Sequence, residues 1–537
     1  MTLITSTATA SQAQPKKKLV TRQDWVYAFS LGSSSLWLSW GAVLGPVFAY
    51  TSPALIRPHV IALLIATVLI PLILVGLVAL IRSLPPTPSR IGRTALVALI
   101  LAHPLAILAV LLRDAVPTRF SVPGALLIDA VFVALWREEL IAVGKTALRL
   151  VFPVSILTIL VGVYVIFTAP GQQAEYAEFH NGRVNDSRHS PILWIIFDEL
   201  DGDLAFGNYP QNRALKEFRK FRQQSLFLEN AQAPNRATIR SIPALLTGTA
   251  INEATPVKGP DLSLDVEGLK DAVRLTRRST VFDDVHRSGR RISLIGYYHP
   301  YCTLFEHSVD ECYWTQWAAE GPWQWPLVGM KFGPIARELE VGVFPYLPLA
   351  SSLRSNDMRD LHRAVIERIV AASKQSLSSG RCSFVLLHLP VPHPPFVFDG
   401  KARSFSETGG SYWGNMQLAD EILGELRRTL EQRGVWDSAT IIVSSDHHWR
   451  YRMWEHSRPR NVSWGPEDIP PTGERIPFMI KLPNQHSEVD YAPHVNTLIT
   501  RELIDQLLKD PGMSTAKLVG WIEANRNRFD FGPVGSE

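Results

Sequence analysis

The stretch "ILWIIFDELDGD", residues 192–203, joins a run of large apolar side chains to a cluster of acidic ones. Six apolar residues in succession, at 192–197, are typical of a strand that is buried on both faces of a parallel sheet. Asp198 and Glu199 follow directly at the end of this strand. Because α/β proteins gather their working residues beyond the carboxyl ends of parallel strands, this stretch predicts both a sheet and a site.

Short apolar runs alternate with helix-like patterns from here to the end of the chain. Further strands are predicted at 291–298, 383–389, 439–445 and 475–482, and we expect the last of these to be the final core strand. Helices are predicted at 211–224, 280–288, 356–378, 412–433 and 494–509. This alternation predicts an α/β domain with a largely parallel central sheet, which we place at residues 191–537.

The first third of the chain is far more apolar than the rest. Five runs are nearly free of charged side chains: 25–56, 58–81, 94–112, 120–136 and 150–168. A run of roughly 20 apolar residues is long enough to cross the hydrocarbon core of a membrane. We therefore expect about five transmembrane helices over 25–168, after a cytoplasmic tail at 1–24 and before a linker at 169–190. The run at 120–136 is the weakest, because it is short and carries Asp129.

The basic residues of the short loops predict the orientation of these helices. Lys and Arg gather before the first run, between the second and third, and between the fourth and fifth. Because basic loops stay on the cytoplasmic side, five crossings place the α/β domain on the periplasmic face of a bacterial-type inner (plasma) membrane. If 120–136 does not cross, the domain stays inside, so the expectation depends on this count.

The cysteines and the overall charge exclude some kinds of site and partner. The three cysteines form no CxxC pair, which argues against a thiolate zinc site. On an oxidising outer face Cys302 and Cys312 either pair or remain free, and the sequence leaves both open. Cys382 precedes an apolar strand and is expected to be a buried thiol. The formal net charge is only +4 and no basic stripe is interleaved with aromatics, so we expect no nucleic-acid partner.

A second predicted strand also ends in residue types that bind metals. The run at 439–445 leads into Asp446, His447 and His448. Carboxylate oxygens and imidazole nitrogens together suit Zn²⁺ or Mn²⁺. With the acidic pair after the first strand they predict a divalent-metal site, whereas each cluster taken alone also fits a solvated turn.

The stretch "APNRATIRSIPALLTG", residues 233–248, places one threonine, Thr238, before a run that is typical of the first turns of a helix. Two interpretations are open for its hydroxyl. Thr is a common helix N-cap, and this role requires no chemistry. The positive end of a helix also favours an anion, and a neighbouring metal lowers the pKa of a hydroxyl enough to make it a nucleophile.

The blocks "IIFDELD", "ATIRSIPALLTG" and "VSSDHH" resemble, in this order, blocks of the alkaline phosphatase/sulfatase superfamily. In layout the chain is similar to its membrane-anchored branch, the phosphoethanolamine transferases of lipid A and the lipoteichoic acid synthases. Those proteins have five N-terminal spans followed by an extracytoplasmic sulfatase-like domain. The resemblance in layout covers nearly the whole chain, whereas the resemblance in sequence rests on the short blocks.

This resemblance implies a role for each matching residue. Glu199 matches the strand-end metal carboxylate of the family, and Asp198 is a possible additional ligand. Thr238 matches the nucleophile, which also contacts the metal. Asp446 and His447 match the second carboxylate and the imidazole ligand.

Other residues are expected to contact the substrate. The block "LHLPVPHPP" resembles a transferase block with two histidines, here His388 and His393, and His393 would contact the substrate phosphate or assist the leaving group. His456 is a further candidate on the substrate side. Arg236 or Arg240 would stabilise charge on the phosphoryl oxygens, and the alternative for both is solvated surface charge.

Two departures from the family bear on the reaction. Sulfatases carry a Cys or Ser that is converted to formylglycine, whereas this chain has Thr238, with Ile242 where their arginine stands. His448 occupies a position where the family often has Gly. The first departure favours a phospho-threonine intermediate over sulfatase chemistry.

The resemblance therefore implies transfer of a phospho-substituent from a phospholipid headgroup to an envelope glycan or lipid acceptor. The cofactor would be a divalent metal, Zn²⁺ or Mn²⁺. Two alternatives remain open from the sequence. One is a hydrolase of the same fold, a phosphodiesterase or phosphatase, which uses water as the acceptor. The other is a non-catalytic envelope protein that binds a glycan or a partner.

Overall fold

The computed structural model describes most of the chain. The described residues are 19–45, 50, 56–89, 91–92, 118–168, 176–178, 189–207, 215–257, 260–315, 348–406, 410–451 and 473–529. They divide into two compact units, which are described separately below. The first contains the described residues of 1–41 and 59–168, and the second contains those of 42–58 and all of those after 168.

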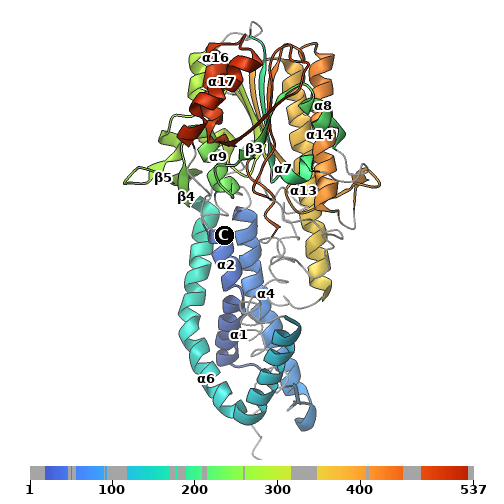
Figure 1. The fold of residues 1–537 in the computed structure, drawn as a ribbon. Helices are drawn as coiled ribbons and strands as arrows, with labels where there is room; N and C mark the ends of the chain where they lie inside the picture. The colour runs from blue at the N-terminus through green and yellow to red at the C-terminus, as the bar shows by residue number, and fades with distance from the viewer. Residues whose placement is uncertain are drawn as a thin grey trace, which may run out of the picture. The chain divides into compact units, whose positions relative to one another are not determined.

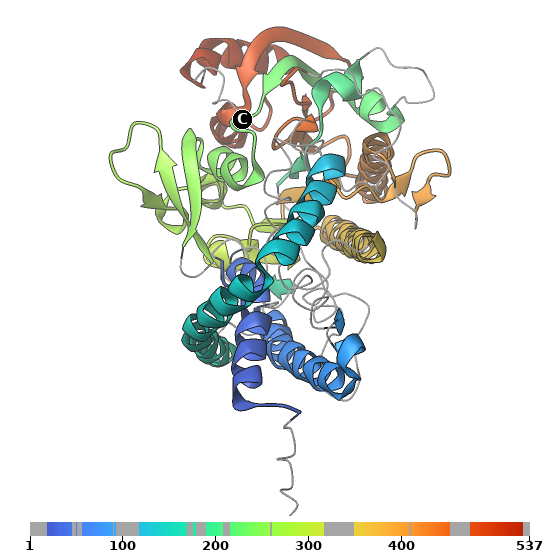
Figure 2. The same cartoon turned by 90° about the horizontal axis from the view of Figure 1, so that it is seen from below.

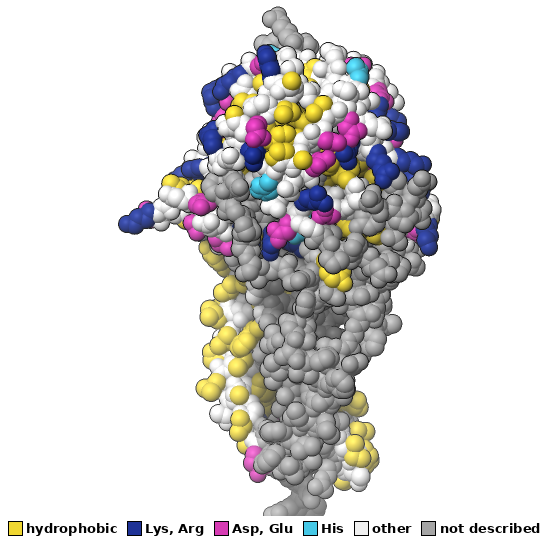
Figure 3. All heavy atoms as spheres, viewed as in Figure 1, with side chains coloured by type: hydrophobic (Ala, Val, Ile, Leu, Met, Phe, Trp, Pro, Cys, Tyr) yellow, Lys and Arg dark blue, Asp and Glu magenta, His cyan; other side chains and the backbone are white. Residues whose placement is uncertain are grey.

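The first unit is helical. Its helices are α1 (Arg22–Ser35), the start of α2 (Trp37–Leu44), most of α4 (Ile56–Ser83) and α6 (Thr118–Thr168). Two described segments, His59–Ser83 and Ile141–Thr168, are long and apolar enough to cross a membrane, by length and composition. Large apolar side chains such as Leu150 and Phe167 are exposed along α6, and Figure 3 shows apolar side chains on this helix. This exposure is expected of a surface that faces lipid.

The predicted spans differ from these helices in several respects. The runs at 58–81 and 150–168 coincide with the two long apolar segments. The run at 25–56 is interrupted at Leu36, between α1 and α2. The run at 120–136 is continuous with 150–168 in one strongly curved helix, α6 (Figure 1). The run at 94–112 lies outside the described residues, so a bundle of five spans stays a prediction.

The second unit is built on a nine-stranded sheet within the described part of the chain. In spatial order its strands are β1 (Tyr176–Glu178), β8 (Glu311–Thr315), β7 (Ile292–Tyr297), β9 (Phe384–Pro392), β2 (Ile192–Asp198), β12 (Thr440–Ser445), β13 (Phe478–Lys481), β3 (Leu226–Gln232) and β14 (Val489–Asn496). All of these except β1 and β13 run in the same direction. The prediction of an α/β domain with a mostly parallel sheet is confirmed.

Helices cover both faces of this sheet. On one side lie α13 (Pro348–Ser379) and α14 (Tyr412–Gln432), and α9 (Thr238–Thr247) lies on the other, as Figures 1 and 2 show. The side chains of β2 alternate between two apolar cores: Ile192, Trp194 and Ile196 join one, and Leu193, Ile195 and Phe197 join the other. Because both faces of β2 are buried, the first six residues of this strand are all apolar.

The remaining elements of the second unit lie around this framework. The other helices are α7 (Gly202–Phe206), α8 (Lys216–Arg222), α10 (Val281–Arg287), α11 (Tyr301–Leu304), α16 (Thr500–Lys509) and α17 (Thr515–Asn525). A small sheet is formed by β4 (Ile251–Val257), β5 (Asp261–Val266) and β6 (Val273–Arg274), and a two-stranded one by β10 (Phe398–Asp399) and β11 (Ser404–Phe405).

Several predicted boundaries were wrong at the side of the sheet that contains β3 and β14. Strand β13 is antiparallel to its neighbours and is not the final core strand, because β14 follows it. The helix predicted at 494–509 begins only at Thr500, after β14 and a short 3₁₀ turn. Strand β3 was not predicted. Strand β14 is an edge strand with exposed residues and a proline, so it lacks the apolar run of a central strand.

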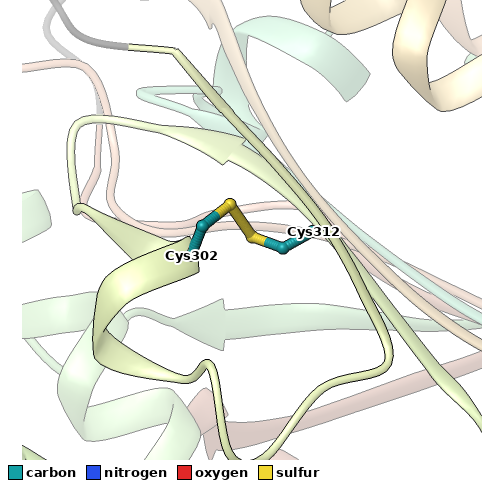
Figure 4. Close-up of a disulfide and its surroundings, with 2 residues drawn as sticks. All are labelled: Cys302 and Cys312. Atoms are coloured by element: carbon teal, nitrogen blue, oxygen red, sulfur yellow. A yellow bond between two sulfur atoms is a disulfide. The ribbon is translucent and has the colours of Figure 1, made fainter. Parts of the chain in front are cut away.

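The structure also settles the pairing of the cysteines. Cys302 in α11 and Cys312 in β8 form a disulfide across a Cα–Cα distance of 5.4 Å (Figure 4). Cys382 is a buried free thiol, as predicted, and burial raises its pKa.

A buried lysine connects β13 to the turn that precedes β12. The Nζ atom of Lys481 donates to the carbonyl oxygens of Trp436, Asp437, Ala439 and Leu482 at 2.9–3.3 Å, and its side chain is fully buried. Replacing it by Met leaves these carbonyls without their donor. We expect Lys481→Met to lower the free energy of unfolding by about 3 kcal/mol, since one unpaired buried polar group costs about 1–3 kcal/mol.

The measurement is denaturant unfolding followed by tryptophan fluorescence. Lys509→Met is the matched control, because Lys509 is exposed and its pair with Asp505 is worth little. Equal unfolding midpoints for the two variants would show that the Lys481 contacts do not stabilise the domain.

Candidate active site

Three neighbouring parallel strands carry the predicted site residues at one edge of the sheet. Strand β2 lies between β9 and β12 and runs parallel to both. Asp198 is the last residue of β2, Asp446 and His447 follow β12, and His393 follows β9. The topology therefore brings together side chains that are up to 249 positions apart in the sequence.

Asp198, Asp446 and His447 form a compact buried cluster. One potential ligand atom from each lies within 4.8 Å of the others. Nε2 of His447 is 3.5 Å from Oδ1 of Asp198 and 3.4 Å from Oδ2 of Asp446. The three side chains are at most 1% exposed.

The surrounding hydrogen bonds orient these atoms toward one another. Nδ1 of His447 lies 3.0 Å from the carbonyl oxygen of His448, so Nδ1 carries the proton and Nε2 presents a lone pair to the cluster. Oδ1 of Asp446 accepts hydrogen bonds from the backbone N–H groups of Glu199 and His447, with N–O distances of 3.0 and 2.8 Å. Its Oδ2 is buried and makes no hydrogen bond within the described residues. Both Nε2 of His447 and Oδ2 of Asp446 are therefore available to a cation.

The electrostatics of the cluster also fit a divalent cation. Burial raises the pKa of Asp198 well above its usual value, and that of Asp446 to about 7. Burial lowers the pKa of His447 well below its usual value, so this imidazole is neutral. Without a cation, burial disfavours both carboxylates, and a bound divalent ion supplies the opposite charge. Two carboxylates and a neutral imidazole are ligands that suit Zn²⁺ or Mn²⁺.

Glu199 lies next to this cluster but has other partners. Its Oε1 accepts from Nε of Arg450 at 2.8 Å and from the Arg450 backbone N–H at 3.3 Å. Its backbone has a φ of +67°, in the left-handed region that non-glycine residues rarely adopt. The Tyr412 hydroxyl donates to the Glu199 carbonyl at 2.7 Å, and the Glu199 N–H donates to Asp446. A metal role for Glu199 therefore stays a prediction, and Arg450 is a site residue that the sequence reading missed.

Thr238 is the first residue of α9 and not its N-cap. The N-cap is Ala237, and Oγ1 of Thr238 lies 3.2 Å from Nε2 of His447 and 3.5 Å from Oδ1 of Asp198. The side chain is buried. The alternative of a helix cap is therefore wrong, because this hydroxyl faces the polar cluster at the positive end of the helix.

Two aromatic side chains that the sequence reading missed support the backbone of Thr238. Nε2 of His299 is 3.2 Å from the Thr238 carbonyl oxygen, and Nδ1 is 2.7 Å from the hydroxyl of Tyr50. Burial lowers the pKa of His299 to about 4, so the ring is neutral. Because a carbonyl oxygen only accepts, Nε2 carries the proton, and the Tyr50 hydroxyl donates to Nδ1.

The other predicted substrate residues lie in varied surroundings. The backbone N–H of His393 donates to the Asp198 carbonyl at 3.1 Å, and Nε2 of His393 is 4.0 Å from Oε2 of Glu199. Burial lowers the pKa of His393 to about 3. His388 is buried on β9, with Nδ1 2.8 Å from the hydroxyl of Tyr301.

Neither predicted arginine lies in the three-residue cluster. Arg236 forms an ion pair with Glu474. Arg240 is 3.6 Å from Glu253. His456 lies outside the described residues. The roles predicted for these residues in substrate binding stay predictions.

Comparison with known proteins finds a family match in the second half of the chain. The family model described as "Sulfatase" matches residues 322–509. No curated protein matches the chain. The matched region contains His393, Asp446 and His447, and the structure adds Asp198 and Thr238 from outside it. This match supports an enzyme of the sulfatase-like class, and it agrees with the resemblance to the alkaline phosphatase/sulfatase superfamily that the sequence blocks indicate.

Several solved structures are distantly similar to this chain. An i-CgsB structure in complex with neocarrahexaose is 14% identical, with 62% of this chain and 74% of that chain covered and a TM-score of 0.39. The phosphonate monoester hydrolase of Agrobacterium radiobacter is 14% identical, with 60% and 74% covered and a TM-score of 0.38. The lipoteichoic acid synthase LtaP from Listeria monocytogenes is 13% identical, with 63% and 76% covered and a TM-score of 0.36.

Replacing one carboxylate of the cluster by an amide tests the metal site. Asp446→Asn keeps Oδ1 for the two backbone N–H groups and removes a buried carboxylate whose pKa is raised. Because the pKa of Asp446 is raised, ionising this side chain lowers the free energy of unfolding. This loss begins as the pH rises above the ordinary aspartate pKa and is fully present above pH 7. At pH 8 and without metal, we expect the variant to melt about 2–4 °C above the wild type.

The same variant should lose the gain in melting temperature that Zn²⁺ or Mn²⁺ gives the wild type, because a ligand is missing. Differential scanning fluorimetry with and without a chelator measures both effects. Asp271→Asn, at an exposed position, is the matched control. A metal-dependent gain that survives in Asp446→Asn would exclude Asp446 as a ligand.

Two substitutions of His299 by an amide residue test whether its Nε2–H holds the backbone carbonyl of Thr238 in place. Gln places an N–H near the position of Nε2, whereas Asn places its amide nearer the position of Nδ1 and loses the contact with Thr238. We expect His299→Asn to lower kcat at least about tenfold, or about 1.4 kcal/mol of activation free energy, and His299→Gln to lower it much less.

The assay uses whichever p-nitrophenyl ester the wild type hydrolyses fastest, among the sulfate, phosphate and phenylphosphonate. The gain in melting temperature that is expected from a metal should persist in both variants, since His299 is not among the three candidate ligands. Equal losses of kcat in the two variants would contradict a role for the Nε2 donor.

Proposed function

We propose that this enzyme transfers a phospho-substituent from a phospholipid headgroup to a cell-envelope glycan or lipid, through a phospho-threonine intermediate on Thr238. The observation that carries the proposal is the position of the Thr238 hydroxyl. It makes contacts of 3.2 and 3.5 Å with His447 and Asp198 and caps no helix. A buried hydroxyl at the start of a helix, facing an imidazole and a carboxylate, has the surroundings of an activated nucleophile.

The first step forms one bond and breaks one. Oγ1 of Thr238 attacks the phosphorus, a Thr–O–P bond forms, and the ester bond to diacylglycerol breaks. The proton of the Thr238 hydroxyl leaves with the diacylglycerol as its hydroxyl proton. A divalent cation held by Asp198, Asp446 and His447 would lower the pKa of the Thr238 hydroxyl and stabilise charge on the phosphoryl oxygens.

The identity of the nucleophile favours phosphoryl over sulfuryl transfer. Sulfatases, in the resemblance described above, use a formylglycine made from Cys or Ser, and this chain has Thr238 at that position. A threonine hydroxyl is able to form a phosphate ester directly. The second step then returns the threonine, when an acceptor hydroxyl attacks the phosphorus and gives its proton to Oγ1.

The location that we propose is a multi-pass inner membrane protein with its catalytic domain on the periplasmic face. The two long apolar segments support a membrane anchor, and the basic loops favour this orientation when all five predicted spans cross. The disulfide between Cys302 and Cys312 supports it as well, because disulfides persist in oxidising compartments. A membrane anchor would keep the domain next to its lipid donors.

Mass spectrometry of the purified protein tests the proposal. After incubation of the full chain with mixed bacterial phospholipids and Zn²⁺ or Mn²⁺, we expect an added phospho-substituent on the peptide that contains Thr238, and its mass identifies the headgroup. The adduct should be absent from Thr238→Ala and from samples with chelator. Thr249→Ala, near the end of α9, is the matched control.

Two other outcomes have distinct meanings. Release of free headgroup phosphate without an added acceptor, in a Thr238-dependent manner, would assign the enzyme as a hydrolase. An unmodified Thr238 with no product from any donor, in protein that binds metal, would refute the proposed reaction.

A further inference from the structure

The segment that carries His393, "PVPHPPFV" at residues 390–397, has few hydrogen-bond donors of its own. Four of its eight residues are proline, which has no backbone N–H. Its carbonyl oxygens therefore outnumber its backbone donors, and nearly all of the segment is buried. Because buried carbonyl groups are almost always paired, donors from other parts of the chain are needed here.

One side chain of α14, Asn415, supplies donors to three of these carbonyls. Its Nδ2 lies 3.3 Å from the carbonyl oxygens of Pro392 and His393 and 3.4 Å from that of Pro395. Its Oδ1 accepts from the backbone N–H of Val397 at 3.0 Å. The side chain is fully buried, and since a carboxamide has only two N–H donors, at least one of them is shared between two carbonyls. Both polar atoms of this side chain therefore serve the His393 segment.

The same turn of α14 also holds the backbone of Glu199. Tyr412 and Asn415 are three residues apart, so they lie on one face of the helix. The Tyr412 hydroxyl donates to the Glu199 carbonyl at 2.7 Å and accepts from the Asp201 N–H at 3.1 Å. The first turn of α14 therefore contacts both of the segments that carry Glu199 and His393.

This part of the chain lies directly against the residue that follows the His393 segment. A Cβ atom at Gly414 would overlap the carbonyl oxygen of Phe398, and a Cβ atom at Gly410 would lie only 2.5 Å from it. The two backbones are thus in contact, with no side chain between them. Close packing of this kind leaves little room for movement, so the hydrogen bonds of Asn415 have a fixed geometry.

These contacts determine where the imidazole of His393 lies. Its Nδ1 lies 2.5 Å from the carbonyl oxygen of Pro394, so Nδ1 carries the proton and Nε2 presents a lone pair. Nε2 is 4.0 Å from Oε2 of Glu199, and the backbone N–H of His393 donates to the Asp198 carbonyl. The ring is therefore held beside Glu199, at the edge of the sheet that carries the metal cluster.

We propose that Asn415 is a positioning residue for the reaction and that it holds the imidazole of His393 opposite Glu199. The inference rests on the proposed function and on the predicted contact of His393 with the substrate. Because Asn415 is fully buried, it acts through His393 and not on the substrate directly. A displacement of about 1 Å in a reacting group costs up to about a hundredfold in rate, so loss of these hydrogen bonds should lower kcat.

A double-mutant cycle between Asn415 and His393 tests this role. The full chain is assayed as wild type, Asn415→Asp, His393→Ala and the double variant, with the p-nitrophenyl ester that the wild type hydrolyses fastest. Asn415→Asp keeps the oxygen that accepts the Val397 N–H and removes the Nδ2 donor. We expect it to lower kcat at least about tenfold in the wild type but less than about twofold in His393→Ala, because coupled residues are not additive.

A purely structural role of Asn415 predicts a different pattern. Loss of stability alone would lower kcat by the same factor with and without His393, and this additivity would overturn the inference. Leu426→Ala is the matched control, because Leu426 is buried in the same helix about three turns further along. It should lower the melting temperature at least as much as Asn415→Asp and leave kcat unchanged.

Hydrogen–deuterium exchange of the full chain measures the hold on the segment without any reaction. Between residues 392 and 397 only His393, Phe396 and Val397 have a backbone N–H. We expect their exchange to accelerate at least about tenfold in Asn415→Ala and to change little in Leu426→Ala, because local opening follows the loss of local contacts. Unchanged exchange in Asn415→Ala would overturn the inference by itself.

The outcomes separate this inference from the proposed reaction. If no adduct forms on Thr238 but the ester assay shows coupling between Asn415 and His393, the phospholipid reaction fails while the positioning role stands. If the adduct forms and the cycle is additive, the reaction stands and the positioning role fails. Where the wild type hydrolyses none of the esters, the rate of adduct formation on Thr238 takes the place of kcat, and absence of both activities would refute both proposals.

Discussion

The burial of three carboxylates at one edge of the sheet is the constraint on which this site depends. Asp198, Glu199 and Asp446 are each at most 1% exposed. Removing a carboxylate from water costs several kcal/mol unless charge or hydrogen bonds replace the lost hydration. Glu199 is compensated by Arg450, and Asp446 in part by two backbone N–H groups. Asp198 faces a neutral imidazole and a hydroxyl, so the uncompensated charge lies at the three-residue cluster.

The same constraint explains why the residues of the site come from strand ends. Charged side chains are costly along a strand that is buried on both faces, so its carboxyl end is the favoured position for a carboxylate. Strands β9, β2 and β12 are neighbours, and their ends bring His393, Asp198 and Asp446 to one edge. Helix α9 begins at the same edge, and its first residue completes the site.

Much of this arrangement was predictable, and for a physical reason. Strand β2 is an apolar run that ends at Asp198, and β12 contains a shorter apolar run that is followed by Asp446 and His447. The sequence therefore places these three residues at strand ends. Strand β14 is partly exposed and contains a proline, so its pattern is that of a loop. Three site residues were not predicted, because each is placed by a contact with a residue that is distant in sequence: His299, Tyr50 and Arg450. A buried arginine and an exposed one look alike in a sequence, because only the folded environment distinguishes them.

The turn after β12 assigns consecutive side chains to different tasks. Asp446 and His447 belong to the cluster, His448 lies beside Arg236 and Glu474, and Arg450 donates to Glu199. Two hydrogen bonds hold the turn in place: Oδ1 of Asp446 accepts from the backbone N–H of Glu199, and the carbonyl oxygen of His448 accepts from Nδ1 of His447. A histidine at 448 in place of glycine therefore adds an imidazole beside the cluster without replacing any of its three residues. Because consecutive side chains of this turn have separate contacts, a substitution at 448 changes the surroundings of the cluster and keeps the three residues that face Thr238.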